Sequence, residues 1–288
     1  MKKNQMIEKI IHRIFLALGL IAVGSVLVIT AYLIISGIPA IIEIGLIDFL
    51  FGREWASTAV EPKFGILPFV LTSIYGTFGA ILIGVPIGFL VAVYLSKVAS
   101  KRVKGFMQSA ISLLASIPSV VYGLVGMLIL VPGIRKVFNV PDGASLLASI
   151  LVLAVMILPT IIKMSITALD AVPKEYEDAS LALGATSMET YFRVSVPAAK
   201  SGIATAVVLG VGRAIGEAMA VIMVAGNAPN MPDSVFQSVR FLTTAVSSEM
   251  SYSSGLQRQA LFSIALVLFV FIMLINGILN FLIKKETE

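Results

Sequence analysis

Long runs of apolar residues without a charged side chain constrain the fold of this sequence more than any other feature. A helix needs about 20 such residues to cross the hydrocarbon core of a bilayer. Hydrophobic residues make up 58% of the 288-residue chain and charged residues 13%, whereas soluble chains carry about 25% charged residues. We therefore expect an all-α integral membrane protein. Five uncharged runs are long enough to span: Ile14–Ile42, Phe64–Ser96, Gly105–Ile134, Gly143–Ile162 and Gln259–Ile283.

The inventory of charged and metal-binding residues removes several other classes of protein. The chain has no Cys and a single His, His12, which excludes disulfides, Cys nucleophiles and zinc sites built from Cys or paired His residues. The formal net charge is +5, but the Lys and Arg residues flank the apolar runs and form no stripe of the kind that binds nucleic acid. We therefore expect these charges to lie beside a lipid bilayer, and we expect no nucleic acid among the partners of the chain.

The run Ser201–Gly226, interrupted only by Arg213 and Glu217, supplies a sixth span. Six spans place both termini on one side of the membrane. The segments on that side hold 14 Lys and Arg residues and the loops on the other side hold 6, so the positive-inside rule predicts cytoplasmic termini. The first run is too long for a signal peptide, and a retained first helix is expected.

Small residues recur at helical spacing in two of the spans. Gly212 and Gly216 lie four residues apart in the fifth span, and contact within the same subunit is the favoured interpretation there. The pattern is common in membrane helices and does not establish a dimer. Four residues of the second span share one helical face and allow a neighbouring helix to approach closely: Gly76, Ala80, Gly84 and Gly88.

The segment 173–197, between the fourth and fifth spans, begins with the pattern of a short amphipathic helix on the cytoplasmic side. Pro173 suits a first helical turn, and the acids Glu177 and Asp178 complement the positive end of the helix dipole. Gly184 is a typical stop. An anionic lipid surface would favour Lys and Arg instead of acids, so we expect this helix to dock into the groove of a soluble partner.

The spacing of the same segment resembles the EAA loop of ABC-importer permeases. Asp178-Ala179-Ser180, three residues, Gly184, nine residues and Val194-Ser195-Val196-Pro197 follow the pattern EAA, three residues, G, nine residues, I-x-L-P, with conservative replacements. In that family the loop docks into the ATP-binding subunit. The resemblance thus implies that six residues couple this chain to an ATPase: Glu177, Asp178, Ala179, Ser180, Gly184 and Pro197.

The sequence contains no Gly-x-x-x-x-Gly-Lys-[Ser/Thr] loop, the motif that cradles the phosphates of ATP. We therefore expect ATP and Mg²⁺ to be bound by a separate ATPase subunit. This chain is then a transporter subunit without a cofactor of its own, and it is not expected to be an enzyme.

Arg213 and Glu217 are the strongest candidates for contact with a substrate. A charged side chain at mid-membrane costs about 2.5–3.5 kcal/mol on insertion scales, so each is expected to face the other, a cavity or a partner helix. At this spacing a structural ion pair is one interpretation. In the other, the Arg213 guanidinium binds an oxyanion. Ionised Glu217 only accepts hydrogen bonds, so it would then favour an oxyanion that keeps a proton, such as hydrogen phosphate, over sulfate.

Two further segments resemble phosphate-importer permeases. The segment 212–221, followed by Gly226-Asn227, is similar to the PstC permeases, and the segment 115–124 is similar to the Pst permeases in general. At Pro118 in the second segment, a simple kink and a lining of the pore are equally favoured. The pore candidates there are Ser116, Ser119 and Tyr122.

The resemblance runs from about residue 64 to residue 283. It implies six transmembrane helices in the type I ABC importer (MetI-like) permease fold, with residues 1–63 preceding a permease core, 64–283, and a cytoplasmic tail, 284–288. It also implies a PstA-type permease, two PstB-type ATP-binding subunits and a PstS-type phosphate-binding protein as partners, in a bacterial or archaeal cell membrane. Since one Arg does not neutralise a doubly charged ion, we expect the partner permease to supply further positive groups.

Three alternatives to a PstC-type phosphate permease stay open at this point. The cargo can be another oxyanion, such as molybdate, sulfate or phosphonate, or the chain can take the PstA role. An ion-coupled secondary transporter with Glu217 as proton carrier predicts uptake without ATP and usually an inverted repeat, which the sequence does not show. A structural subunit without transport would use Arg213 and Glu217 for packing alone.

Overall fold

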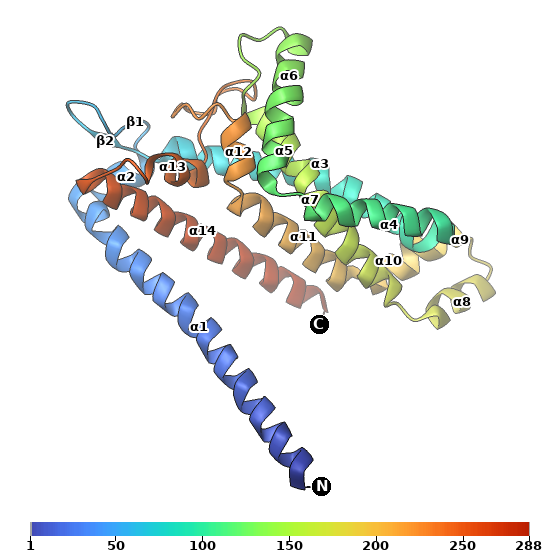
Figure 1. The fold of residues 1–288 in the computed structure, drawn as a ribbon. Helices are drawn as coiled ribbons and strands as arrows, with labels where there is room; N and C mark the ends of the chain where they lie inside the picture. Colours follow the sequence, from blue (N-terminus) through green and yellow to red (C-terminus); the bar gives the residue numbers. More distant parts are fainter. Residues whose placement is uncertain (1, 288) are drawn as a thin grey trace.

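The computed structural model describes residues 2–287, most of them in helices (Figure 1). The first and last helices, α1 (Lys2–Ile44) and α14 (Gly255–Thr287), run antiparallel. They touch where Ser263 Oγ donates a 2.5 Å hydrogen bond to the Gly37 carbonyl. Most of α1 is exposed within this chain, as expected of a helix that is covered by lipid or by another subunit.

The packed core is formed by α3 (Leu67–Val93) and α7 (Leu146–Asp170), which lie in close contact. The stripe of small residues on α3 makes this contact possible. A Cβ added to Gly84 would lie 2.7 Å from the Ile157 side chain, and Ile157 is fully buried. The packing role predicted for the stripe is therefore confirmed.

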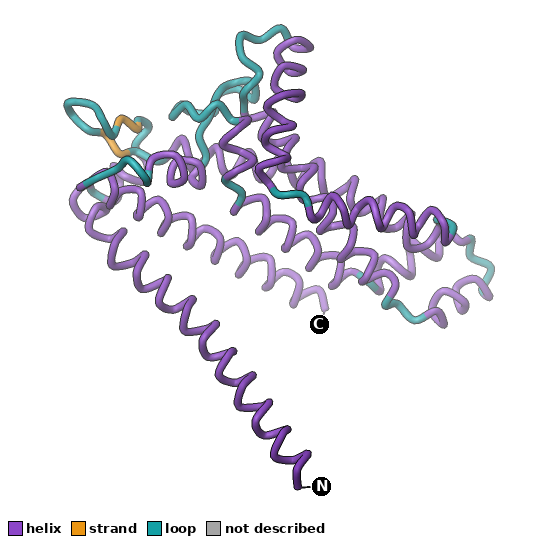
Figure 2. Tube along the Cα trace, in the orientation of Figure 1, coloured by secondary structure: helices purple, strands orange, loops and turns teal. Residues whose placement is uncertain are grey.

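One end of the bundle carries a small β-hairpin and two short helices, and we call it the hairpin end (Figure 2). Its strands pair antiparallel, with Trp55 opposite Phe64. Glu249 joins the parts of this end, because its carboxylate accepts a 3.2 Å hydrogen bond from Trp55 Nε1 and forms an ion pair with Arg240. The elements of the hairpin end are α2 (Leu46–Phe51), β1 (Trp55–Ala56), β2 (Lys63–Phe64) and α13 (Leu242–Glu249).

The third predicted span, 105–134, is not a single helix. Pro118 lacks an N–H and disfavours helical dihedrals at the preceding residue, and Ile117 accordingly has ψ 127°. A separate helix therefore ends at Ser116, and the span runs from Ser119 to Phe138. The elements of this region are η1 (Tyr94–Val98), α4 (Lys101–Ser116), α5 (Ser119–Val125), η2 (Gly126–Leu130) and α6 (Val131–Phe138), where η marks a π-helical turn.

The fifth predicted span, 201–226, is divided as well. Its helix ends at Gly216, and a short helix follows after two residues. A Cβ added to Gly212 or Gly216 would meet no atom within 4 Å, so the contact within the same subunit that we predicted for this pair is wrong. The elements are α8 (Lys174–Ala182), α9 (Ser187–Thr190), η3 (Tyr191–Ser195), α10 (Val196–Ala198), α11 (Lys200–Gly216) and α12 (Met219–Val224).

Five described helices are long and apolar enough to cross a membrane, and a bent helix pair gives a sixth span if it is counted as one. In that pair, Ser187–Ala198 and Lys200–Gly216 meet at 70°. The start of α1 and the end of α14 both lie away from the hairpin end (Figure 1), as an even number of spans requires. The five unbent spans are Ile11–Ile44, Leu67–Val98, Ser119–Phe138, Leu146–Asp170 and Gly255–Leu279.

Candidate translocation and coupling sites

The break between α11 and α12 places non-helical backbone among the membrane helices. Glu217 has extended dihedrals, φ −74° and ψ 128°, and its carbonyl accepts a 2.8 Å hydrogen bond from Thr243 Oγ1. Its carboxylate Oε1 accepts a 2.9 Å hydrogen bond from the Ala220 N–H in the first turn of α12. Such backbone is tolerated at membrane depth where protein or an aqueous cavity surrounds it. Glu217 thus helps to satisfy the polar groups of its own break.

Arg213 turns to α7 instead of Glu217. Because α11 ends at Gly216, the helical geometry that would bring the two charges together is lost. Arg213 Nη1 donates a 3.3 Å hydrogen bond to Thr160 Oγ1, and the side chain is half-buried. Within residues 2–287 no ion pair joins Arg213 to Glu217, so the structure does not support the pairing that their spacing allows.

The break at Pro118 brings α5 against α12, beside these two charges. A Cβ added to Gly123 would lie 2.9 Å from backbone atoms of Ala220, so the two short helices cross at this glycine. Tyr122 packs against the apolar cluster that includes Ala220. The structure therefore places Tyr122 of α5 near the break after α11 that holds Glu217, four residues beyond Arg213. Contact of these residues with a substrate stays a prediction.

Two of the predicted pore residues form hydrogen bonds that have a structural role at the break between α4 and α5. Ser116 Oγ donates a 2.8 Å hydrogen bond to the Leu113 carbonyl, and Tyr122 OH donates a 2.7 Å hydrogen bond to the Leu114 carbonyl. A helix leaves its last carbonyls without intrahelical donors, and these two hydroxyls supply them. Ser119 starts α5 and is half-buried. A pore-lining role for the three remains a prediction.

Most of the predicted coupling residues lie on an open surface. Gly184 ends the α8 segment with φ +88°, a conformation that favours glycine. Beside it, the Leu183 side chain is 90% exposed, as expected of an apolar contact awaiting a partner. Ser180 is half-buried and lies with its Oγ 3.0 Å from Thr190 Oγ1. The exposed members of the predicted set are Asp178, Ala179, Gly184 and Pro197.

Glu177, the remaining member of that set, faces the bundle. Its Oε1 lies 2.5 Å from Lys97 Nζ, and the two side chains are only 19% and 10% exposed. The same oxygen accepts a 2.8 Å hydrogen bond from Ser195 Oγ, and Lys97 Nζ also donates a 3.0 Å hydrogen bond to the Leu169 carbonyl. Burial raises the pKa of Glu177, but the hydrogen bonds from Lys97 and Ser195 outweigh it and hold the pKa below its ordinary value.

Sequence reasoning missed Lys97, which it counted only as one of the inward positive charges. The available signal was a Lys in the last turn of an otherwise apolar span. A second ion pair lies in the same region, where Lys104 Nζ is 2.8 Å from Asp170 Oδ2 and Ser96 Oγ donates a 2.6 Å hydrogen bond to Asp170 Oδ1. This second pair is more open, with side chains 27% and 42% exposed.

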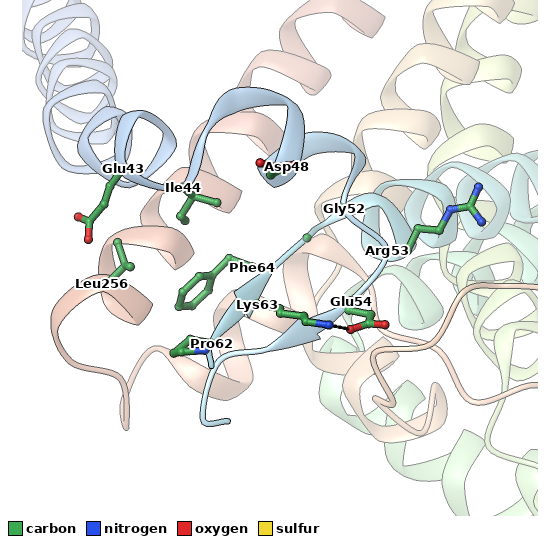
Figure 3. A pocket seen from close by; sticks show the side chains of 11 residues that line it. Glu43, Ile44, Asp48, Gly52, Arg53, Glu54, Pro62, Lys63, Phe64 and Leu256 are labelled. Atoms are coloured by element: carbon green, nitrogen blue, oxygen red, sulfur yellow. Dashed lines mark hydrogen bonds and ion pairs between the residues drawn. The ribbon is translucent and has the colours of Figure 1, made fainter. Parts of the chain in front are cut away.

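A cavity of about 580 Å³ lies at the hairpin end (Figure 3). Glu43, Asp48 and Arg53 contribute to its lining, together with a Lys63–Glu54 ion pair of 2.5 Å. Both members of this pair are well exposed, so it contributes little to stability. The cavity shares no lining residue with the group around Arg213, and no sequence motif pointed to it.

The relatives of the chain agree with this arrangement. Residues 84–287 match the family described as "binding-protein-dependent transport system inner membrane component". The chain is 39% identical to the probable ABC transporter permease protein YqgH of Bacillus subtilis (strain 168), over 96% of this chain and 92% of the relative. It is 32% identical to the phosphate transport system permease protein PstC of Pasteurella multocida (strain Pm70), over 83% of this chain and 80% of the relative.

Solved structures show the same fold. A crystal structure of a bacterial alginate ABC transporter in complex with a periplasmic protein matches with a TM-score of 0.66 at 16% identity, over 96% of this chain and 95% of that chain. An inward-facing structure of the MetNI methionine ABC transporter matches with a TM-score of 0.58 at 20% identity, over 78% and 95%. The predicted MetI-like permease fold is therefore confirmed.

Fold and relatives together define a multi-pass membrane permease of the ABC class, in which ATP is hydrolysed by a separate subunit. The chain belongs to the family of binding-protein-dependent transport system inner membrane components, as a PstC-type member. Permeases of this family act with an ATPase, a permease partner and a binding protein, so the same kinds of partner are expected here.

Proposed function

We propose that this chain forms part of the transmembrane pathway of an ATP-driven phosphate importer. The observation that carries the proposal is its 31–32% identity to PstC permeases of several bacteria over more than four fifths of its length. The half-buried Arg213 supports it, because a guanidinium offers a planar fork of donors to an oxyanion. In the described residues one of these donors is engaged by Thr160, and others are available to a substrate.

The partners in this proposal are a PstA-type permease, two PstB-type ATP-binding subunits and a PstS-type phosphate-binding protein. The complex lies in the inner or cytoplasmic membrane with both termini of this chain in the cytoplasm. ATP and Mg²⁺ are bound by the ATPase subunits and not by this chain. The exposed surface of α8 and Gly184 supports docking of an ATPase at this end.

In the transport cycle, ATP binding closes the two ATPases and displaces the coupling segment 173–185. The two permeases then rock into the outward-facing form, and phosphate passes Arg213 toward the cytoplasm. One guanidinium does not balance a doubly charged ion, so the partner permease contributes further positive groups. A complex that transports phosphate with this chain as its only permease would contradict that part of the proposal.

The test is ATP-driven uptake of labelled phosphate by the chain co-reconstituted with its partner subunits, with sulfate and molybdate as competitors. Arg213→Ala removes the guanidinium, and Arg213→Lys keeps the charge but loses the planar fork. Thr160→Val is the matched control, because it removes the hydrogen bond to Arg213 and leaves the charge in place. We expect uptake to disappear in Arg213→Ala, to fall in Arg213→Lys and to persist in Thr160→Val.

Each outcome separates the proposal from its alternatives. Uptake that survives in Arg213→Ala would return this residue to a packing role. Competition by sulfate or molybdate would leave the assignment as an ATP-driven importer in place but would change the assigned substrate to that oxyanion. Uptake that follows a proton gradient in the absence of ATP would favour an ion-coupled secondary transporter.

A further inference from the structure

We propose that Lys97, Glu177 and Ser195 form a clasp that stays closed during transport and carries the movement of α8 into the membrane spans. The inference rests on the proposed ATP-driven function, because it assigns a route for the force that an ATPase applies to α8. Glu177 is then a positioning residue on the inner face of the coupling helix and not part of the docking surface.

The clasp joins four elements at one ion pair. Lys97 lies in η1, which continues α3, and it also holds the Leu169 carbonyl at the end of α7. Glu177 lies in the middle of α8. Ser195 lies in η3, which leads through α10 into α11. A displacement of α8 therefore acts at once on the two helices of the packed core and on the helix that carries Arg213.

The enclosure of the clasp explains why it stays closed. Lys97 and Glu177 are 10% and 19% exposed, and removal of one partner from a buried ion pair leaves an uncompensated charge in a poorly solvated site. The nearby Lys104–Asp170 pair is more open, so solvent replaces its contacts more easily. Opening the clasp thus costs more free energy than separating Lys104 from Asp170.

In the part of the chain that the structure describes, the other side-chain hydrogen bond of α8 does not reach η1 or α7. Within the described residues, the Ser180 hydroxyl meets Thr190 of α9, which belongs to the same cytoplasmic segment. The outer face of α8 is exposed along Asp178 and Ala179. The polar contacts that reach η1 from α8 are those of Glu177.

The first experiment measures coupling in the reconstituted complex. Glu177→Gln keeps the shape of the side chain and removes its charge, Ser195→Ala removes the second hydrogen bond, and Asp170→Asn is the control at the open pair. Assembly, ATP hydrolysis and phosphate imported per ATP are measured for each. Coupling free energies of this kind correspond to about fivefold or more, so we expect phosphate imported per ATP to fall about fivefold in Glu177→Gln. Ser195→Ala is expected to fall less and Asp170→Asn to match wild type.

A second experiment tests the rigidity of the clasp independently of the cargo. The chain has no Cys, so Val98→Cys in η1 and Ala182→Cys in α8, both exposed positions, carry a pair of spin labels without further changes. We expect one narrow label-to-label distance that is the same without nucleotide and with ATP bound, and a broadened distribution when Glu177→Gln is added.

The outcomes distinguish the clasp from the proposed function. A wild-type complex that hydrolyses ATP but imports no phosphate contradicts phosphate as the substrate. The spin-label distances still show in that case whether the clasp stays closed. A distance that changes on ATP binding overturns the closed clasp. An unchanged ratio of phosphate to ATP in Glu177→Gln, or a complex that loses assembly, ATP hydrolysis and uptake together in both Glu177→Gln and Ser195→Ala, overturns its role in transmission.

Discussion

At the scale of single residues, Glu217 has two expected tasks, one as a hydrogen-bond acceptor and one as a negative charge. Its Oε1 atom accepts a hydrogen bond from the Ala220 N–H and so holds the start of α12. Its negative charge would repel an oxyanion that has lost all of its protons. A Gln side chain can take over the first task, since its amide oxygen is also an acceptor, but it cannot take over the second.

We therefore expect Glu217→Gln to fold and transport but to discriminate less against sulfate. Glu217→Ala loses the acceptor as well, and the loss of the hydrogen bond from the Ala220 N–H costs about 1 kcal/mol. Competition of labelled phosphate uptake by sulfate measures the first effect, and thermal unfolding in detergent measures the second. Equal rejection of sulfate by wild type and Glu217→Gln would show that the charge is not the filter.

At the scale of elements, the crossing of α5 and α12 depends on one glycine. A Cβ on Gly123 would approach the Ala220 backbone to 2.9 Å, so one helix has to move. Gly133 lies in the same span, and a Cβ there would meet nothing within 4 Å. The two positions thus differ in packing and share the same gain in helix propensity when Gly is replaced by Ala.

Gly123→Ala is expected to destabilise the chain by about 1–3 kcal/mol through overpacking. Gly133→Ala is expected to be neutral or to stabilise by up to about 1 kcal/mol. Thermal unfolding of the purified chain in detergent compares them directly. A melting temperature of Gly123→Ala equal to that of Gly133→Ala would mean that α12 shifts at no cost.

The element α8 also predicts a dependence of stability on pH. Hydrogen bonds from Lys97 and Ser195 hold the pKa of Glu177 below its ordinary value of 4.5. A lowered folded-state pKa stabilises the fold above the unfolded pKa, and this contribution is lost as the pH falls through the folded pKa. We expect wild type to lose more stability than Glu177→Gln between pH 5 and pH 3, as measured by unfolding in detergent. Parallel pH profiles would contradict this contribution.

The sequence predicted the membrane helices and the close approach of a neighbouring helix to the stripe that includes Gly84, because length, lack of charge and residue size determine these features directly. The structure identifies that neighbour as α7. The sequence did not predict how the third and fifth spans divide. Pro118 predicted a kink, with or without a lining of the pore, but not that the chain divides into two helices there. No residue type marks the extended backbone at Glu217. The Lys97–Glu177 contact joins residues 80 positions apart, and one sequence carries no signal for such a distant pair.

At the scale of the whole molecule, the N-terminal part is packed onto the permease core. Ser263 of α14 bonds the Gly37 carbonyl of α1, and Glu249 of α13 holds Trp55 of the hairpin. The hairpin end and α8 lie at different ends of the chain fold (Figure 1). If positive charge fixes the topology, the hairpin faces the outside and α8 faces the cytoplasm.

This orientation can be measured because the chain has no Cys that would react on its own. Val60, in the loop between β1 and β2, and Leu183, beside α8, are both almost fully exposed, so Val60→Cys and Leu183→Cys form a matched pair. With a membrane-impermeant thiol reagent on intact cells, we expect Val60→Cys to be labelled and Leu183→Cys to be labelled only after permeabilisation. Co-expression of the ATPase should then protect Leu183→Cys but not Val60→Cys, because an ATPase docked on α8 covers that side chain. The reverse pattern in intact cells would invert the topology and place the proposed ATPase surface on the wrong side of the membrane.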